Sequence, residues 1–203
     1  MLRTLLRFFD NASKLILVST ADMRATAGTL QIFERPELSA GWKGAASPER
    51  VVVGYNGLGW AHPFRDKAIN DEPLKFEGDK RTPAGIFQLG AAFGFSATDK
   101  SDYFQLKYSE TFCVNDPRSP HYNKIVPRSV AGWRTSGEDM RSVDLYRRGL
   151  VINYPTNASQ RGGPAFFFMS GAQQIHQQLV ASQCRNKLSL IFRHGQPRIK
   201  RSC

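Results

Sequence analysis

The amino-acid sequence predicts one mainly β domain, a β-rich α+β fold with one or two helices, on three observations. The chain has 203 residues, the length of a single domain. Short runs rich in β-branched residues and closed by turn residues recur along it, which is typical of strands. Hydrophobic residues make up 41% of the chain and include 14 Phe and three Trp, enough bulky side chains to fill a core.

Five segments carry the strand pattern. KLILVST and RVVVGYNG are short β-branched runs, and GTLQIFER alternates between apolar and polar residues. AGIFQLG follows a tight turn, and GLVINYP is an apolar run typical of a buried strand. The expected strands therefore cover residues 14–20, 28–35, 50–57, 84–90 and 149–155.

The segment SGEDMRSVDLYRRG, residues 136–149, carries the strongest helix pattern. Ser136 can cap its amino end, acidic residues occupy the first turn, arginines occupy the last turn, and Gly149 follows. Residues 113–126 contain Asp, Pro and Asn at short intervals, so we expect a loop there.

The last fifth of the chain differs in composition from the rest. Residues 164–203 contain six Lys or Arg and no Asp or Glu, so they supply +6 of the net charge of +11. A basic surface can meet nucleic acid, anionic lipid or an anionic wall polymer. We expect no nucleic-acid partner, because a solvated basic face and a solvated basic end explain these charges.

The cysteines and histidines favour neither a disulfide framework nor a metal site. The three cysteines are scattered and show no CxxC spacing, and the four histidines are isolated from one another. We therefore expect no metal and no cofactor. Cys113 is expected to be a half-buried structural residue.

The sequence predicts no membrane span, because no apolar run is long enough to cross a bilayer. The amino-terminal segment has arginines beside apolar residues, as a signal peptide does. Asp10 and Lys14 interrupt that segment, and LILVST fits a first strand better, so we expect no cleaved signal peptide in this frame.

Several segments together resemble the catalytic domain of the YkuD-like L,D-transpeptidases, in particular their short stand-alone bacterial branch. They are ATAGTLQIFERPELSAGW, EGDKRTPAGIFQLGAAFGF, CVNDPRSPHYN, WRTSGEDM and GLVINYP, which follow the family's order and spacing over residues 14–160. The resemblance implies a β-sandwich with one or two helices. It also implies an enzyme of the cell envelope or periplasm, expected to be a monomer, that acts on peptidoglycan stem peptides.

The resemblance implies an acyl transfer with a cysteine nucleophile. In this family the thiolate attacks the carbonyl of the third stem residue and releases the terminal D-alanine, and an amine of a neighbouring stem then takes the thioester. Such chemistry requires a Cys activated by a nearby His, with backbone N–H groups facing the oxyanion. The family carries that His in a strand of the type FLHVW and the Cys twelve residues later in PTAGC.

This chain departs from the family pattern after VINYP. The family continues with Gly-Ser-Cys-Ile-Phe, whereas this chain continues into GGPAFFFMSGAQQIHQQLVASQC. No His–Cys pair occurs in frame at the family spacing, so we expect no catalytic residue in frame. His176 and Cys184, eight residues apart, are a fallback pair, but Gly does not precede Cys184 and no strand pattern surrounds them.

A shift of the reading frame explains the departure. New codons can be formed from the third base of each codon, starting at Gly162, and the first two bases of the next codon. With the free third bases chosen to fit, these new codons can encode GSCIFFHVWRAANSPTAGCVAM. The His of this string spans the codons of Phe168 and Met169, and the Cys of its PTAGC segment follows twelve codons later. A slip near residues 161–163 would leave the family's C-terminal catalytic strands missing or replaced.

These observations predict an incomplete L,D-transpeptidase-like domain at residues 14–163 and an aberrant basic tail at residues 164–203. By family the chain is an acyltransferase, but we expect this chain to be inactive. The alternative is a non-catalytic wall-binding or regulatory domain whose tail has truly diverged. A second, weaker alternative is an active enzyme that uses Cys184 as its nucleophile.

The candidate substrate-binding residues are Gly78, Asp79, Arg81 and Tyr122. The first three can line a groove, or they can set a tight turn, with Gly for an unusual φ and Asp for a local hydrogen bond. We favour the structural role and expect Arg81 to be the one that faces substrate. For Tyr122 the two roles are equally supported.

Loss of the family's catalytic strands would also affect folding. The strands GIFQLG and GLVINYP would lack a partner, and their backbone groups would be unpaired. We therefore expect a marginal or aggregation-prone product. AFFFM and LSLIF are both apolar and strand-like, so they are the segments that could replace the missing pairing.

Overall fold

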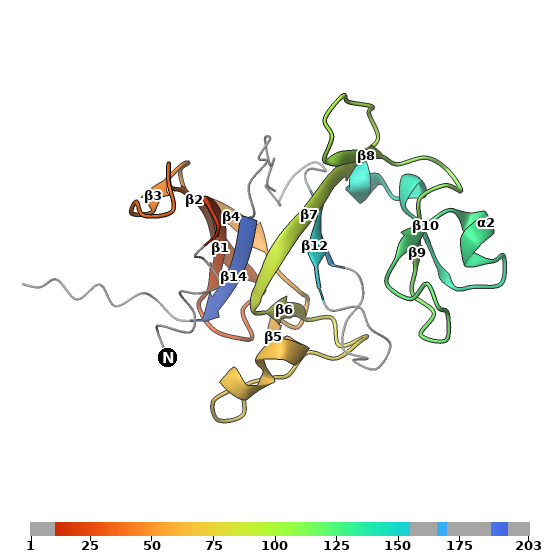
Figure 1. The fold of residues 1–203 in the computed structure, drawn as a ribbon. Helices are drawn as coiled ribbons and strands as arrows, with labels where there is room; N and C mark the ends of the chain where they lie inside the picture. The colour runs from red at the N-terminus through yellow and green to blue at the C-terminus, as the bar shows by residue number, and fades with distance from the viewer. Residues whose placement is uncertain (1–10, 155–165, 170–187, 195–203) are drawn as a thin grey trace, which may run out of the picture.

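The computed structural model describes residues 11–154, 166–169 and 188–194 (Figure 1). The fold is mainly β, which confirms the predicted fold class, and its strands form sheets of nine, three and two strands. The described helical elements are short: α2 (Arg128–Ala131) and the 3-10 helices η1 (His62–Lys67), η2 (Met140–Ser142) and η3 (Asp144–Arg147). No helix among these residues is long and apolar enough to cross a membrane.

The nine-stranded sheet is the framework of the molecule. Its main path runs in the order β13–β12–β7–β14–β1–β2–β3, while β4 pairs with β2 and β8 pairs with β7. Its strands are β1 (Lys14–Thr20), β2 (Ala27–Glu34), β3 (Lys43–Gly44), β4 (Glu49–Val52), β7 (Ile86–Gly94), β8 (Tyr103–Gln105), β12 (Arg148–Asn153), β13 (Phe166–Met169) and β14 (Leu188–His194).

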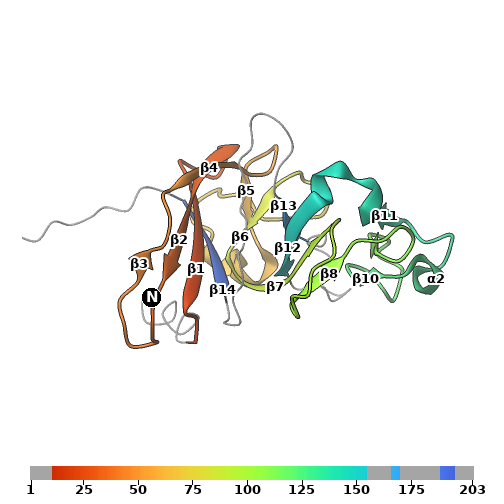
Figure 2. The same cartoon turned by 90° about the horizontal axis from the view of Figure 1, so that it is seen from above.

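Two small sheets accompany the framework. One is the parallel pair β5 (Leu58–Trp60) and β6 (Thr82–Ala84). The other has the order β10–β9–β11 and contains β9 (Phe112–Val114), β10 (Ile125–Val126) and β11 (Gly137–Asp139). Figure 2 shows this second sheet and α2 at one end of the molecule, with β1, β2 and β3 at the other.

Strand β14 joins the two halves of the large sheet. It pairs in parallel with β1, from Lys14 opposite Leu188 to Thr20 opposite His194. On its other side it pairs antiparallel with β7. Figure 1 shows it between these two strands, although it comes from the compositionally unusual tail.

The expectation that GIFQLG and GLVINYP lack strand partners was wrong. Strand β7 is paired with β12 and β14, and β12 is also paired with β13. The tail segments AFFFM and LSLIF supply these partners, because β13 covers residues 166–169 and β14 begins at Leu188. Because both strands are paired, unpaired strand edges give no reason to expect a marginally stable or aggregation-prone protein.

The core follows from strand alternation. In β1 the side chains of Ile16, Val18 and Thr20 are buried, as expected for residues two apart on one face of a strand. Ile16 and Val18 belong to the main cluster, which takes side chains from both the large sheet and the β5–β6 pair and includes Leu30, Leu58, Ala84, Phe87, Ile152 and Tyr154. A second cluster around Phe93, Leu106 and Met140 lies towards the β9–β11 end.

The helix expected over residues 136–149 does not form. Gly137–Asp139 pairs with β9 instead, the middle of the segment makes the two 3-10 helices η2 and η3, and Arg148 already begins β12. Ser136 caps nothing, since its hydroxyl donates to Asn115 Oδ1 at 2.6 Å. Strand pairing and the complete burial of Met140 override the local helix pattern here.

Two other boundaries differ from the predicted ones. The strand expected over residues 50–57 ends at Val52. The segment expected to be a loop, residues 113–126, contains most of β9 at its start and the two residues of β10 at its end. The turn residues between them do form the loop that the sequence predicts.

Candidate functional site

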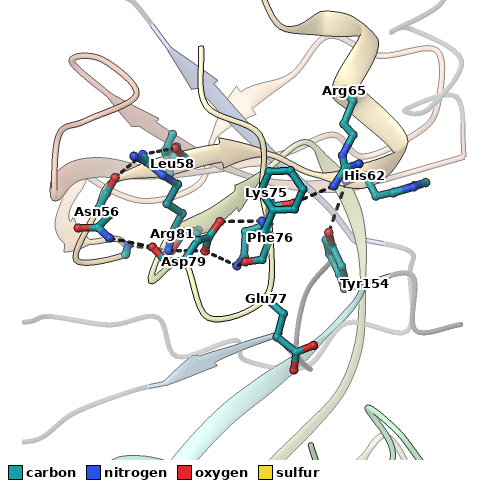
Figure 3. A network of polar contacts seen from close by, with 12 residues as sticks. Asn56, Leu58, His62, Arg65, Lys75, Phe76, Glu77, Asp79, Arg81 and Tyr154 are labelled. Atoms are coloured by element: carbon teal, nitrogen blue, oxygen red, sulfur yellow. Dashed lines mark hydrogen bonds and ion pairs between the residues drawn. The ribbon is translucent and has the colours of Figure 1, made fainter. Parts of the chain in front are cut away.

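The segment from Lys75 to Arg81 forms a turn organised by the carboxylate of Asp79 (Figure 3). This carboxylate accepts hydrogen bonds from the backbone N–H of Phe76 at 2.7 Å and of Arg81 at 2.9 Å. Gly78 has a φ of +77°, in the left-handed region that glycine adopts without steric cost. We call residues 75–81 the Asp79 turn.

A buried ion pair closes the Asp79 turn. The ammonium of Lys75 contacts Asp79 Oδ1 at 2.5 Å and also donates to the carbonyl of Phe76. The Lys75 side chain is only 4% exposed and that of Asp79 17%. Because a buried charge is costly without a partner, each of these two groups depends on the other.

Arg81 ties the Asp79 turn to the segment that leads into β5. Its Nη1 donates to the carbonyl oxygens of Asn56 and of Leu58, the latter at 3.0 Å. Asn56 Nδ2 in turn donates to the carbonyl of Asp79 at 2.8 Å. This gives Arg81 the structural role that the sequence favours, while contact of its guanidinium with substrate stays a prediction.

Tyr122 reaches the same turn from the loop between β9 and β10. Its hydroxyl donates to Glu77 Oε2 at 2.6 Å, although the side chain is only 3% exposed. Burial, followed by the hydrogen bond to the Glu77 carboxylate, raises the pKa of Tyr122 well above its usual value, so the phenol stays protonated. The four predicted residues therefore meet: three lie within one turn, and the fourth is joined to it through Glu77.

Sequence reasoning missed Lys75 and Glu77. Both stand in LKFEGDK, and Lys75 lies between two apolar residues, Leu74 and Phe76. A lysine in an apolar run with an aspartate four residues later is a local signal for an ion pair. The partner of Glu77 lies 45 residues away, so no local pattern could have identified it.

The Asp79 turn lies beside Tyr154, which follows β12. Tyr154 is 4% exposed, and its hydroxyl accepts from the backbone N–H of His62 at 3.4 Å. Burial raises the pKa of Tyr154, and the charges of Arg65 and Asp79 also act on its hydroxyl. Arg65 donates to the carbonyl of Lys75 at 3.1 Å, which joins η1 to the turn. In the view of Figure 3, Tyr154, His62 and Arg65 lie on one side of Lys75 and Asp79, and Asn56 and Arg81 lie on the other.

Cys113 is a poor nucleophile in this fold. It lies half-buried in β9, and burial, with a smaller contribution from Glu138, raises the pKa of its thiol to about 11. At neutral pH only about one molecule in ten thousand would carry the reactive thiolate. This environment agrees with the structural role expected for Cys113. The fallback residues His176 and Cys184 lie outside the described residues.

The described residues thus offer a rigid, hydrogen-bonded turn without an activated nucleophile beside it. They also contain no group of three or more His, Cys, Asp or Glu side chains placed to hold a metal ion. Comparison with protein-family models, with curated proteins and with solved structures gave no match.

Proposed function

We propose that the chain is a YkuD-like L,D-transpeptidase domain for peptidoglycan stem peptides whose catalytic His and Cys are absent from the printed sequence. One observation carries the proposal. The residues Gly78, Asp79 and Arg81, which match the family's motif, form one hydrogen-bonded turn beside Tyr154. Tyr154 is the last residue described before the segment in which the family pattern requires Gly-Ser-Cys.

The arrangement of the sheets supports a β-sandwich of the family's type. Leu58 of β5 and Ala84 of β6 pack in the same cluster as Ile16 and Phe87 of the large sheet. Two sheets that share one apolar core in this way are the basis of a sandwich. The strands that we propose as substitutes for the family's catalytic strands are β13 and β14.

The proposed activity requires a thiolate that the described residues do not supply. Burial keeps the thiol of Cys113 protonated, and this residue lies in β9, more than 30 positions after the Asp79 turn in the sequence. Without a thiolate no thioester with the stem peptide can form. We therefore propose that the printed chain performs no acyl transfer. For the intact enzyme we propose the cell envelope or periplasm as the compartment, because its proposed substrate is peptidoglycan.

A comparison of the printed chain with a frame-restored chain tests this function. The restored chain would carry the string GSCIFFHVWRAANSPTAGCVAM from Gly162 onward. We expect it to form one covalent adduct with a carbapenem-type acylating probe, seen as a mass increase of the intact protein. Replacing the Cys of its PTAGC segment by Ser should abolish the adduct.

The printed chain should form no adduct under the same conditions. If an adduct forms on the printed chain and is lost in Cys184→Ser, then Cys184 is the nucleophile and our proposal is wrong. If the restored chain also fails to react, the family assignment itself is wrong. The alternative is a non-catalytic wall-binding domain, which the net charge of +11 favours. Co-sedimentation of the inactive printed chain with peptidoglycan would support it only together with coding DNA that confirms the printed frame.

A further inference from the structure

An arginine in the region between β7 and η3 contacts two aromatic rings. The guanidinium of Arg141 lies 3.9 Å from the ring centre of Phe95 and 4.9 Å from that of Tyr108. Arg147 lies 5.5 Å from the ring centre of Phe95. Arg141 thus contacts two rings and Phe95 contacts two arginines, and we call Tyr108, Arg141, Phe95 and Arg147 the Arg141 stack.

The N–H groups of the Arg141 guanidinium are available for a ligand. Within the part of the chain that the structure describes, this guanidinium makes no hydrogen bond and no ion pair. The neighbouring arginines differ, because Arg128 donates to the carbonyls of Trp133 and Thr135, and Arg147 pairs with Asp144 at 2.9 Å. The two rings contact the guanidinium through their π faces, an interaction that uses none of its N–H donors.

The backbone around the Arg141 stack is held in place before any ligand binds. Tyr108 is 63% exposed, and the next residue, Ser109, has a φ of +59°. That conformation is fixed on both sides, because Ser109 N–H donates to Asp139 Oδ2 at 2.8 Å and Arg128 N–H donates to the Ser109 carbonyl at 2.7 Å. Asp139 Oδ1 also accepts from the backbone N–H of Arg141 at 3.1 Å.

The chemistry of the Arg141 stack fits one carboxylate. A guanidinium edge with unshared donors binds a carboxylate through two parallel hydrogen bonds, and the exposed ring of Tyr108 offers an apolar surface beside it. Acidic side chains stand close by in the sequence, at Glu138 and Asp144, and both are exposed. Glu138 accepts from the Tyr146 hydroxyl and Asp144 pairs with Arg147, and their negative charges disfavour a continuous polyanion such as a phosphodiester chain.

We infer that Arg141 and Tyr108 form a subsite for a single carboxylate of an acidic oligopeptide. This inference rests on the proposed function, under which the oligopeptide is a peptidoglycan stem. The subsite is separate from the Asp79 turn and from Tyr122, and it requires neither the catalytic His nor the catalytic Cys. The printed chain therefore keeps it.

Calorimetric titration of the full printed chain with a soluble stem tetrapeptide tests the inference. We expect Arg141→Gln to weaken binding roughly tenfold, because charge-assisted hydrogen bonds are lost. Arg141→Lys should weaken it to a similar degree, because lysine keeps the charge but not the planar fork. Arg134→Gln is the matched control, an exposed arginine without a stacked ring, and should change the affinity less than twofold. A tetrapeptide with amidated carboxylates should not bind.

Thermal melts of each variant separate loss of the subsite from loss of the fold, and Arg141→Lys keeps the test valid if Arg141→Gln unfolds. Equal binding by Arg141→Lys, or by the amidated peptide, would overturn the inference. Displacement of the peptide by a single-stranded oligonucleotide would also overturn it and identify a nucleic-acid surface. Failure of the proposed function gives a different result, because the frame-restored chain would then not be acylated by the probe. In that case Arg141 and Tyr108 could still bind a carboxylate, but a stem peptide would no longer be the proposed ligand.

Discussion

A chain truncated after residue 187 should not unfold cooperatively, whereas a chain truncated after His194 should melt as the full chain does. The first truncation removes β14, the strand between β1 and β7. In the described fold no other strand pairing joins the β1–β4 half of the large sheet to the half that contains β7, β8, β12 and β13.

The expected loss is large because β14 is paired on both sides. It faces all of β1 from Lys14 to Thr20, and it faces β7 from Ile86 to Gln88. Each lost backbone hydrogen bond contributes about 0.5–1.5 kcal/mol, and orphaned buried groups cost more. Their sum is comparable with the free energy of unfolding of a whole domain, about 5–15 kcal/mol.

Circular dichroism during heating, with urea titration at fixed temperature, measures this effect. Truncation after His194 is the matched control, since it shortens the same tail but leaves β14 complete. If the chain that ends at residue 187 melts at the same temperature and with the same sharpness as the control, then β14 does not join the sheet. The part of the tail that follows residue 187 would then contribute nothing to the fold.

The substitution Asp79→Ala should destabilise the protein by about 3–5 kcal/mol, the cost of breaking a buried ion pair by removing one partner. It leaves the Lys75 ammonium, in a side chain 4% exposed, without its carboxylate. It also removes the acceptor of the Phe76 and Arg81 backbone N–H groups. Urea unfolding monitored by tryptophan fluorescence measures the change.

The matched control is Glu110→Ala, which breaks an exposed ion pair. Lys107 and Glu110 lie 3.3 Å apart, with side chains 58% and 63% exposed. Solvent screens such pairs, so we expect a change within about 0.5 kcal/mol. Equal destabilisation by the two substitutions would contradict the central role that we give to Asp79 in the turn.

Local sequence patterns predicted the longer strands β1, β2, β7 and β12, but they missed short strands such as β5, β6 and β9. KLILVST forms β1 with the expected boundaries, and GLVINYP and AGIFQLG lie largely in β12 and β7. These segments are β-branched or apolar and are closed by turn residues, so their local preference and their tertiary role agree. The helix predicted over residues 136–149 was wrong for the opposite reason. Pairing of Gly137–Asp139 with β9 outweighs the favourable residues at both ends of the predicted helix.

The candidate site could be predicted only in part. The Gly and Asp of EGDKRTP predicted a tight turn, and the structure contains one there. The contacts that fix its surroundings could not be predicted, because Arg81 to Asn56 and Tyr122 to Glu77 join residues 25 and 45 positions apart. Local patterns carry no information about such distant pairs. The added strand partners of β12 and β7, by contrast, are β13 and β14, which lie in the two apolar tail segments that the sequence analysis named as possible replacements.

Sequencing of the coding DNA across codons 155–190 tests most directly whether the chain is an L,D-transpeptidase-like enzyme with a displaced reading frame. We expect one base gained or lost near codons 161–163, with a corrected frame that encodes His-Val-Trp and, twelve codons after that His, the Cys of Pro-Thr-Ala-Gly-Cys. The contradicting result is a DNA sequence that confirms the printed frame without any slip. The tail would then be genuine, and Cys184 would be the first residue to substitute.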